Sequence, residues 1–369
     1  MMPTLQPGQR LGIMGTGAPA QQLATVARQA GLQVFTAPAT PAGATNPLAD
    51  LSGTRAFAQQ CDLVTSVTQP VAPSILTTIA QYTRFPQGSE LTELSQDRAL
   101  EQAFFQSLNL NTRPVQTVIT VADVDHAIAT LGLPAQLLPI IKGSSISAEL
   151  SLQTPADVAQ FAPLAGQGSY LYVPAVDVQH QFVVFATKAE PGELKLFPPV
   201  AVAANGRLLT IMAAKTLAPD LAAALQQATS KVGQALSTIG NFGVAFLLTT
   251  TGLLYVTGLQ LPLSSLTVSL SRGCNFTPAE LHLRALSELP LPTVEPLVPQ
   301  QWCGFSTNAE PAALVARRQH PDWEFDFSYR SPTDATRTGG VWVPTTDPER
   351  TKQQLQQSGL LNLPSEKGK

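Results

Sequence analysis

Charged residues are scarce in this 369-residue chain, because Asp, Glu, Lys and Arg make up only 13% of it, about half of the roughly 25% found in an average soluble domain. The formal net charge is −3 and no long basic stretch occurs, so we expect no nucleic-acid partner and no anionic membrane surface. No apolar run approaches the roughly eighteen residues that span a bilayer, and the first residues lack the order of a signal peptide. The sequence predicts a cytoplasmic protein of two or three domains.

Cysteine is also rare. Cys61, Cys274 and Cys303 are widely spaced, none belongs to a CxxC pair, and the four histidines are not in metal-ligand spacing with them. An odd number of scattered cysteines is typical of buried, reduced thiols. We therefore predict neither a zinc site nor a disulfide framework.

The N-terminal pattern indicates a nucleotide-type fold. LGIMGTG (11–17) is an apolar strand that runs into glycines, a segment with apolar residues at helical spacing follows, and LQVFTAP (32–38) reads as a second strand. Such strand-helix-strand units build parallel sheets. The GTG turn suits a phosphate or is simply structural, since Ala20 replaces the third glycine of GxGxxG. Without a full fingerprint or a hydride-transfer site, a dinucleotide oxidoreductase is not favoured.

The rest of the chain alternates helices and strands, which predicts a mixed α/β and α+β architecture. Residues 94–107 predict one amphipathic helix, and LLPIIKG (137–143) predicts a strand that ends in Lys142. Residues 240–263 form a hairpin pattern with no Asp, Glu, His, Lys or Arg, and the chain from about 295 onward reads as a small β-rich tail.

This order of parts resembles the ATP-grasp superfamily, and within it the carboxyaminoimidazole ribonucleotide synthases of purine biosynthesis. The resemblance rests on LGIMGTG, CDLVT (61–65), SQDRALEQAFF (95–105), PIIK, the hairpin and, above all, ELHLRALSELPLP (280–292). It implies an ATP-grasp fold with a Rossmann-like pre-ATP-grasp domain, an ATP-grasp domain of two subdomains and a small β-rich C-terminal domain. The implied bounds are 1–105, 106–295 (split into 106–182 and 183–295) and 296–369.

The family's reaction needs acidic residues that this chain lacks. In the family, ATP and bicarbonate give carboxyphosphate, whose carboxyl group passes to the amine of aminoimidazole ribonucleotide, and Mg²⁺ on the phosphates requires carboxylate ligands. The positions that match the family's metal-binding residues on the second strand of the hairpin are Thr257 and Gly258. The matching position on the first strand falls on or near Leu248. No Asp or Glu occurs from residue 221 to 279, so a shifted alignment finds no ligand either.

Five positions match the family's ATP site. Two glutamates of the family become Val173, which follows Tyr172, and Gln181, whereas Arg98 and Lys142 keep the family's residue types. Either these two cations still contact phosphates, or Lys142 is a solvated lysine at a strand end and Arg98 pairs with Asp97 or Glu101.

The remaining parts of the family's site are altered as well. The flap over 147–153 has no glycine, so its backbone is not suited to approach a triphosphate. The substrate-site acids are absent from TSVTQPV (65–71), and a family histidine is absent from RTGGVWV (337–343). We assign no chemistry to His282 and Arg284 of the ELHLRA helix.

The sequence therefore predicts a degenerate homologue of the synthase, catalytically impaired and with a binding or regulatory role. No catalytic residue and no metal ligand is assigned, Mg²⁺ is not expected, and ATP is expected to bind weakly or not at all. The resemblance implies a homodimer, and an intact paralogous synthase would be a natural second partner. The alternative is an active synthase with a rebuilt ATP and metal site.

Overall fold

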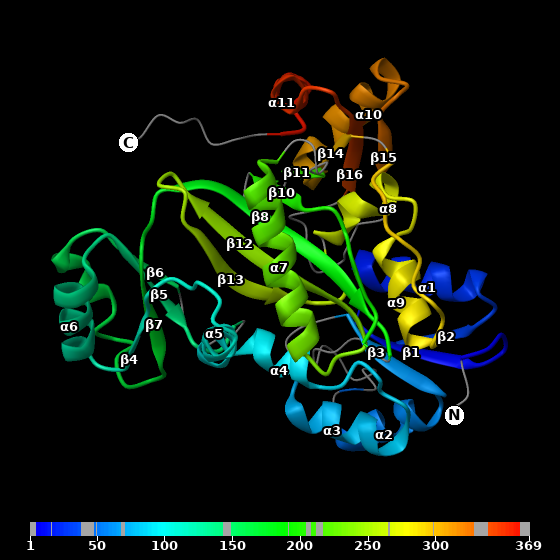
Figure 1. Ribbon diagram of the computed structural model, residues 1–369, viewed down its shortest axis with the longest axis horizontal. Helices are drawn as coiled ribbons and strands as arrows, with labels where there is room; N and C mark the ends of the chain where they lie inside the picture. The colour runs from blue at the N-terminus through cyan, green and yellow to red at the C-terminus, as the bar shows by residue number, and fades with distance from the viewer. Residues whose placement is uncertain are drawn as a thin grey trace.

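The computed structural model describes residues 5–15, 17–37, 48, 50–67, 71–142, 149–190, 192–203, 208–211, 217–264, 266–297, 299–327 and 339–361. Within these residues the strands form three sheets of three, nine and four strands. Figure 1 shows the small four-stranded sheet with helix α6 at one end of the molecule, the nine-stranded sheet in the middle with helix α7 across it, and the three-stranded sheet near α1.

The N-terminal sheet is parallel, in the order β2-β1-β3, which confirms the predicted strand-helix-strand unit. Gly12 of β1 allows the C-terminal end of helix α2 to approach, because a Cβ there would lie 2.8 Å from the Cys61 sulfur and 3.0 Å from the Phe57 ring. The elements of this layer are β1 (Arg10–Met14), α1 (Gly17–Gln29), β2 (Gln33–Ala37), α2 (Leu51–Gln59), β3 (Leu63–Ser66) and α3 (Pro73–Tyr82).

The single helix predicted over 94–107 is wrong, because the chain forms two helices, α4 (Glu90–Gln96) and α5 (Arg98–Ser107). Asp97 separates them with an extended backbone, and its side chain accepts hydrogen bonds from the amides of Ala99 and Leu100. An aspartate in this N-cap position starts a new helix by satisfying its first free amides. The break aligns the chain at Asp97 with Ile141 in an isolated β-bridge.

The four-stranded sheet is antiparallel, in the order β4-β7-β5-β6. Strand β5 ends at Pro139, so Lys142 lies beyond the strand and not at its end as predicted. Lys142 instead follows the bridge to Asp97 and donates its amide to the Gln96 carbonyl. The elements are β4 (Gln116–Val118), α6 (Val121–Leu131), β5 (Ala135–Pro139), β6 (Leu150–Leu152), the 3₁₀ helix η1 (Pro155–Gln160) and β7 (Tyr170–Pro174).

The nine-stranded sheet runs β13-β12-β8-β10-β11-β14-β16-β15, with β9 paired to β8. The predicted hairpin is confirmed as β12 and β13, and β13 is an edge strand. The C-terminal strands β14 to β16 continue this sheet through β11. The strands are β8 (Val178–Lys188), β9 (Leu194–Leu196), β10 (Val200–Ala203), β11 (Leu208–Ile211), β12 (Gly240–Thr249), β13 (Leu254–Gln260), β14 (Gln300–Phe305), β15 (Glu324–Asp326) and β16 (Gly339–Pro344).

Helices cover this sheet and its C-terminal end. Long helix α7 packs over β8 and β12, while α9 contacts the same two strands and α1 (Figure 1). The helical elements are α7 (Pro219–Ala235), η3 (Thr267–Ser269), α8 (Leu270–Gly273), α9 (Pro278–Leu286), η4 (Thr307–Ala309), α10 (Glu310–Gln319) and α11 (Pro348–Gln357).

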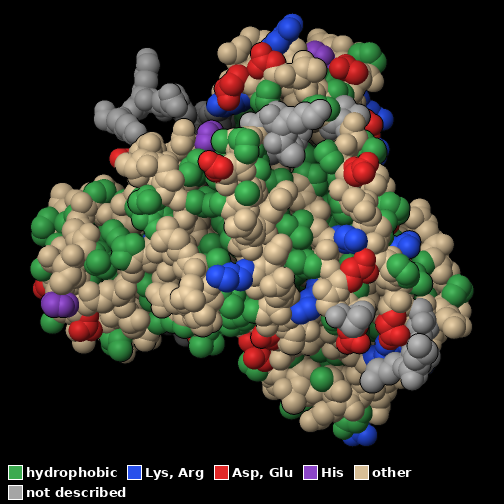
Figure 2. All heavy atoms as spheres, viewed as in Figure 1, with side chains coloured by type: hydrophobic (Ala, Val, Ile, Leu, Met, Phe, Trp, Pro, Cys, Tyr) green, Lys and Arg blue, Asp and Glu red, His purple; other side chains and the backbone are tan. Residues whose placement is uncertain are grey.

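The surface is poor in charge, as the composition indicates. Figure 2 shows Lys, Arg, Asp and Glu side chains as isolated spots among broad uncharged areas of the visible face. All three cysteines are buried and none is in a disulfide, and burial raises the pKa of the Cys61 thiol to about 11 and that of Cys274 to about 12. No helix in the described part of the chain is long and apolar enough to cross a membrane.

Candidate functional site

A narrow cavity lies where helix α5 meets β5, β7 and the hairpin strand β13. Three of the five residues predicted to match an ATP site line it, namely Arg98, Lys142 and Val173, together with Thr257 from the position of a predicted metal ligand. The cavity has a volume of only about 80 Å³. Pockets that hold drug-sized ligands typically measure about 300–1,000 Å³. The structure therefore brings these residues together around a space for a few water molecules.

Glu101 is the central group of this cavity and was not singled out from the sequence. Its side chain is 5% exposed, its Oε2 lies 2.7 Å from Lys142 Nζ, and its Oε1 accepts the Leu259 amide of β13 at 2.6 Å. Burial raises the pKa of the Glu101 carboxyl above its ordinary value, and the Lys142 charge and the Leu259 amide offset part of that rise. Glu101 and Phe105 are the two buried residues of α5, so a carboxylate on an otherwise apolar helix face was the available signal.

The two cations do not have the environments that the simpler sequence interpretation predicted. Lys142 is not a solvated lysine, since its ammonium group is 28% exposed and pairs with Glu101. Arg98 pairs with neither Asp97 nor Glu101. Its Nη2 lies 2.6 Å from Glu149 Oε1, and its Nη1 donates to the Pro139 carbonyl at 2.7 Å. Arg98 thereby joins the start of α5 to the end of β5 and the start of β6.

The residues at the family's metal positions do not fit Mg²⁺. Gly258 faces Glu101, because a Cβ added at Gly258 would lie 3.4 Å from Glu101 Oε1. That carboxylate is already engaged by an ammonium group and a backbone amide, whereas Mg²⁺ requires several free oxygen ligands in octahedral geometry. Leu248 supplies no oxygen and lines a different hollow. Among the described residues no group of three His, Cys, Asp or Glu side chains is placed to hold a metal ion.

The other two predicted residues lie outside the narrow cavity. Gln181 lines a larger hollow of about 600 Å³, which also includes Leu248 and Lys352 and is bounded by β8, β10, β11, α7 and α11. Tyr172 lies in neither hollow. Its ring is buried in the core of the four-stranded sheet, and its hydroxyl donates to the Gly132 carbonyl. Alternation along β7 explains the difference, since Val173 points to the opposite face.

Some predicted segments cannot be compared with the structure. Residues 143–148, which include the start of the flap predicted over 147–153, lie outside the described residues, as do 68–70 of the substrate-site segment and 337–338 of the C-terminal segment. Thr16 of the GTG turn is also outside them.

A buried polar network centred on His282 joins α9 to two sheets. His282 is fully buried, its Nδ1 accepts the Asn241 amide of β12 at 2.9 Å, and its Nε2 lies 2.9 Å from the Thr65 hydroxyl of β3. Because Nδ1 accepts, Nε2 carries the proton and donates to Thr65, whose hydroxyl donates to Gln87 Oε1 at 2.6 Å. Burial lowers the pKa of His282 to about 3, so the ring is neutral. The network positions the N-terminal sheet against the hairpin.

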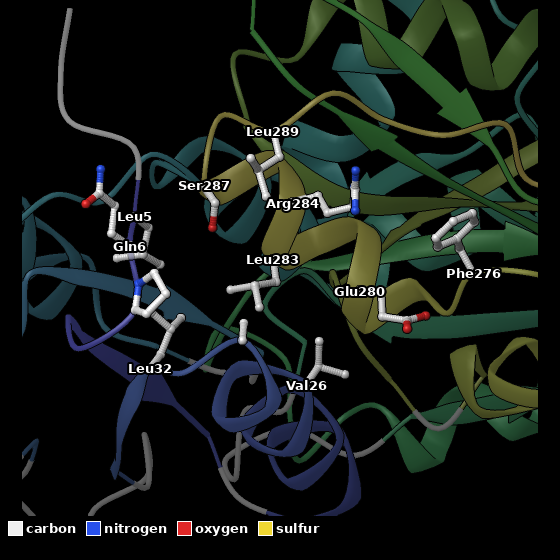
Figure 3. Close-up of a pocket in the computed structure, with 12 residues that line it drawn as sticks. Leu5, Gln6, Val26, Leu32, Phe276, Glu280, Leu283, Arg284, Ser287 and Leu289 are labelled. Carbon is white, nitrogen blue, oxygen red and sulfur yellow. The ribbon is translucent and has the colours of Figure 1, made fainter.

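A third hollow of about 420 Å³ lies between α1 and α9 and is mostly apolar. Figure 3 shows Val26 and Leu283 facing each other across it, with Glu280 and Arg284 of α9 nearby. Both charged groups already have backbone partners, since the Glu280 carboxylate accepts the Thr277 amide and Arg284 Nε donates to the Pro290 carbonyl. Neither charged side chain in the described lining of this hollow is therefore without a hydrogen-bond partner.

Comparison with known proteins places this geometry in context. No family model matches the chain. An N5-carboxyaminoimidazole ribonucleotide synthase of Bacillus subtilis (strain 168) is 26% identical over 309 residues, which are 80% of each protein. The crystal structure of N5-carboxyaminoimidazole synthetase from Staphylococcus aureus complexed with ADP aligns with a TM-score of 0.86 at 20% identity, over 97% of this chain and 98% of that one.

A second solved structure has the same fold as this chain. N5-carboxyaminoimidazole synthase from Aspergillus clavatus, in complex with ADP and 5-aminoimidazole ribonucleotide, aligns with a TM-score of 0.82 at 16% identity, over 95% of this chain and 98% of that one. Together, the sequence matches and the fold show that this chain has the ATP-grasp fold of the N5-carboxyaminoimidazole ribonucleotide synthases and is a divergent homologue of them.

Proposed function

We propose that the chain does not carboxylate aminoimidazole ribonucleotide and instead has a binding or regulatory role. The observation that carries the proposal is the state of Glu101, the one carboxylate among the residues that line the narrow cavity. Lys142 and the Leu259 amide engage both of its oxygens. Transfer of a phosphoryl group from ATP depends on Mg²⁺ to neutralise the phosphate oxygens, and the described lining of this cavity offers no free carboxylate for it.

The expected loss of catalytic rate supports the same proposal. Removal of one group that stabilises a transition state typically slows an enzyme by about 10² to 10³-fold. Here the positions that match the family's metal-binding acids and an adenine-side acid have changed together, to Leu248, Gly258 and Val173 among others. Such losses are not additive, yet jointly they leave no useful rate.

Nucleotide affinity is also expected to be weak. Solved structures of related synthases contain ADP, but in this chain Arg98 and Lys142 already have carboxylate partners. Both ion pairs must open before the two cations contact a phosphate, and the cavity must widen well beyond about 80 Å³. We infer that ATP binds weakly, if at all, and without Mg²⁺.

The proposed partners follow from the fold that this chain shares with the synthases. The fold matches the synthases over nearly the whole chain, so we propose a homodimer in the cytoplasm, with an intact paralogous synthase as a second partner where one is present. A chain that keeps the fold without the acids fits a role in assembly or regulation. This part of the proposal is tested by the mass of the purified protein alone and mixed with such a synthase.

The decisive test of inactivity is a turnover assay. Purified protein is incubated with aminoimidazole ribonucleotide, Mg-ATP and bicarbonate, and ADP release is followed with an active synthase such as that of Bacillus subtilis as the positive control. We expect no release above the rate without aminoimidazole ribonucleotide. Substrate-dependent turnover near the ordinary enzymatic rate of about 1 per second or faster would instead establish the alternative, an active synthase with a rebuilt site, which the shared location of Arg98 and Lys142 favours.

A further inference from the structure

The hollow between α1 and α9, called here the α1–α9 hollow, is large enough for a small molecule. Its volume of about 420 Å³ lies within the range of about 300–1,000 Å³ that is typical of ligand pockets. It shares no described lining residue with the narrow cavity. Much of its wall is apolar and comes from the N-terminal segment, from α1 and the residues after it, and from α9, namely Leu5, Val26, Leu32 and Leu283 (Figure 3).

Two opposite charges of α9 line this hollow without neutralising each other. Glu280 and Arg284 are four residues apart with the acid first, which is the spacing and order that favour an ion pair on a helix. In the described structure the two side chains nevertheless form no ion pair with each other. The Glu280 Oε2 instead accepts the Thr277 amide at 2.6 Å, and the Arg284 Nε donates to the Pro290 carbonyl at 3.0 Å. Contacts with the backbone therefore hold the two charges apart.

Both side chains keep hydrogen-bonding capacity for a ligand. A guanidinium group has five N–H donors, and Arg284 uses the one on Nε, so its two Nη groups remain for a carboxylate. Among the described residues, Glu280 Oε1 has no hydrogen-bond donor. Ser287, one turn beyond Arg284, also lines the hollow, is 4% exposed, and its hydroxyl has no partner in the described part of the chain. The hollow thus offers donors for one carboxylate and an acceptor for one ammonium group.

We propose that the α1–α9 hollow binds a free α-amino acid with a large apolar side chain. The carboxylate pairs with the Nη groups of Arg284 and the ammonium group with Glu280, while the side chain packs against the apolar wall. Both charges of an α-amino acid are attached to one carbon, so the molecule can bridge two groups on neighbouring helical turns. A ligand with a single charge would leave the other group without a counterion in a largely apolar space, which is unfavourable.

The test uses the full-length protein with L-phenylalanine and L-leucine as probes. Three comparison compounds each lack one feature: 3-phenylpropanoate has no ammonium group, 2-phenylethylamine has no carboxylate, and glycine has no apolar side chain. Affinities are measured by calorimetric titration at constant ionic strength. Because each omission removes a charge-assisted hydrogen bond or the apolar contact, we expect L-phenylalanine to bind about tenfold or more tightly than each comparison compound. Absence of binding by both probes, or equal binding of 3-phenylpropanoate and L-phenylalanine, contradicts the proposal.

Two variants assign the two charges separately. Glu280→Gln should remove the preference for L-phenylalanine over 3-phenylpropanoate, and it keeps the cap of α9 because glutamine also serves in a capping box. Arg284→Gln should remove the preference over 2-phenylethylamine. Arg28→Gln is the control, since this exposed arginine in the last turn of α1 is not among the described lining residues, and it should keep both preferences. A wild-type preference in either α9 variant overturns the assignment.

Ala30→Phe tests the location without changing a charge. Ala30 is exposed, follows α1 directly and lines the hollow, so a larger side chain there should fill the space while the protein still folds. We expect the affinity for both amino acids to fall about tenfold or more, with thermal unfolding as the check on folding. Undiminished binding by the folded variant places the ligand elsewhere and overturns the site.

The oligomeric state distinguishes another occupant of the hollow. If the wild type binds neither amino acid and Ala30→Phe lowers the mass of a dimer to that of a monomer, a second copy of the chain covers the hollow, which contradicts the proposal. The inference does not depend on the proposed inactivity, because the turnover assay concerns the narrow cavity, whose described lining is different. Failure of one proposal therefore leaves the other open to its own test.

Discussion

Lys142 Nζ lies 2.7 Å from Glu101 Oε2, and the other oxygen of the same carboxylate accepts the Leu259 amide of an edge strand. One buried carboxylate thus ties together helix α5, the segment after β5 and the hairpin. The side chain that matches a phosphate-contacting lysine in the synthases is held by an internal acid. This contact engages the one carboxylate in the described lining of the cavity.

The Glu101 carboxylate should leave a signature in the pH dependence of stability. Its pKa is raised by burial above 4.5, so the folded state holds this proton more tightly than the unfolded chain does. Stability from this group is therefore present at low pH and is lost as the pH rises from about 4.5 through the raised pKa. Glu101→Gln should cost about 1–3 kcal/mol, and the difference in unfolding free energy from the wild type should shrink as the pH rises.

Urea unfolding of both proteins between pH 4.5 and 8 measures this difference. Glu149→Gln is the matched control, because Glu149 also pairs with a cation but its side chain is 62% exposed, and such surface pairs contribute about 0–1 kcal/mol. A difference for Glu101→Gln that grows with pH would mean that the Lys142 charge outweighs burial and lowers the pKa of Glu101.

The neutral His282 ring should make the protein acid-sensitive. The pKa of His282 is lowered from 6.5 to about 3 by burial. Between these pH values His282 is protonated in the unfolded chain but neutral in the folded protein. The contribution of neutral His282 to the free energy of unfolding is therefore fully present above about pH 6.5 and is lost as the pH falls toward 3. At 1.36 kcal/mol per pKa unit the loss is of order 4 kcal/mol.

His282→Gln should remove that acid-side slope. At pH 7 it should also cost about 2–4 kcal/mol, since Gln cannot serve both the Asn241 amide and the Thr65 hydroxyl in the same positions. Unfolding free energies of the two proteins between pH 4 and 7 are the measurement. If the two curves run parallel across that range, His282 is not the titrating group.

Two glycines of the hairpin should respond differently to the same substitution. Gly240 has φ +112°, and an added Cβ would lie 2.6 Å from the His282 ring, whereas Gly252 in the turn has φ +84° with nothing within 4 Å. Both Ala variants carry backbone strain, of about 1–3 kcal/mol. Gly240→Ala should cost more because it also displaces His282, and equal unfolding temperatures for the two variants would contradict the packing described.

The parts of the fold that local patterns determine could be predicted from the sequence. Two apolar runs around a Thr-rich turn with a glycine indicated the hairpin, and the absence of any Asp or Glu from 221 to 279 could be seen without a structure. The break at Asp97 could in principle have been predicted, because aspartate is a preferred N-cap residue. Its side chain accepts hydrogen bonds from the first free amides of α5.

The site itself could not be predicted, because its contacts join distant segments. The Glu101 carboxylate meets an amide 158 residues away, and no local pattern in α5 shows that contact. The orientation of Tyr172 depends on which face of β7 packs against α6. The resemblance singled out Arg98 and Lys142, which line one cavity, but could not supply their partners, Glu149 and Glu101.

We propose that the narrow cavity has lost a metal-dependent nucleotide site, and the affinity for ATP with and without Mg²⁺ tests this most directly. Calorimetric titration at constant ionic strength would report both values, with an active synthase measured alongside. The account predicts weak binding that Mg²⁺ does not strengthen, since Leu248 and Gly258 offer no ligand and Glu101 is engaged. An affinity that rises about tenfold or more with Mg²⁺, equivalent to about 1.4 kcal/mol, would contradict it.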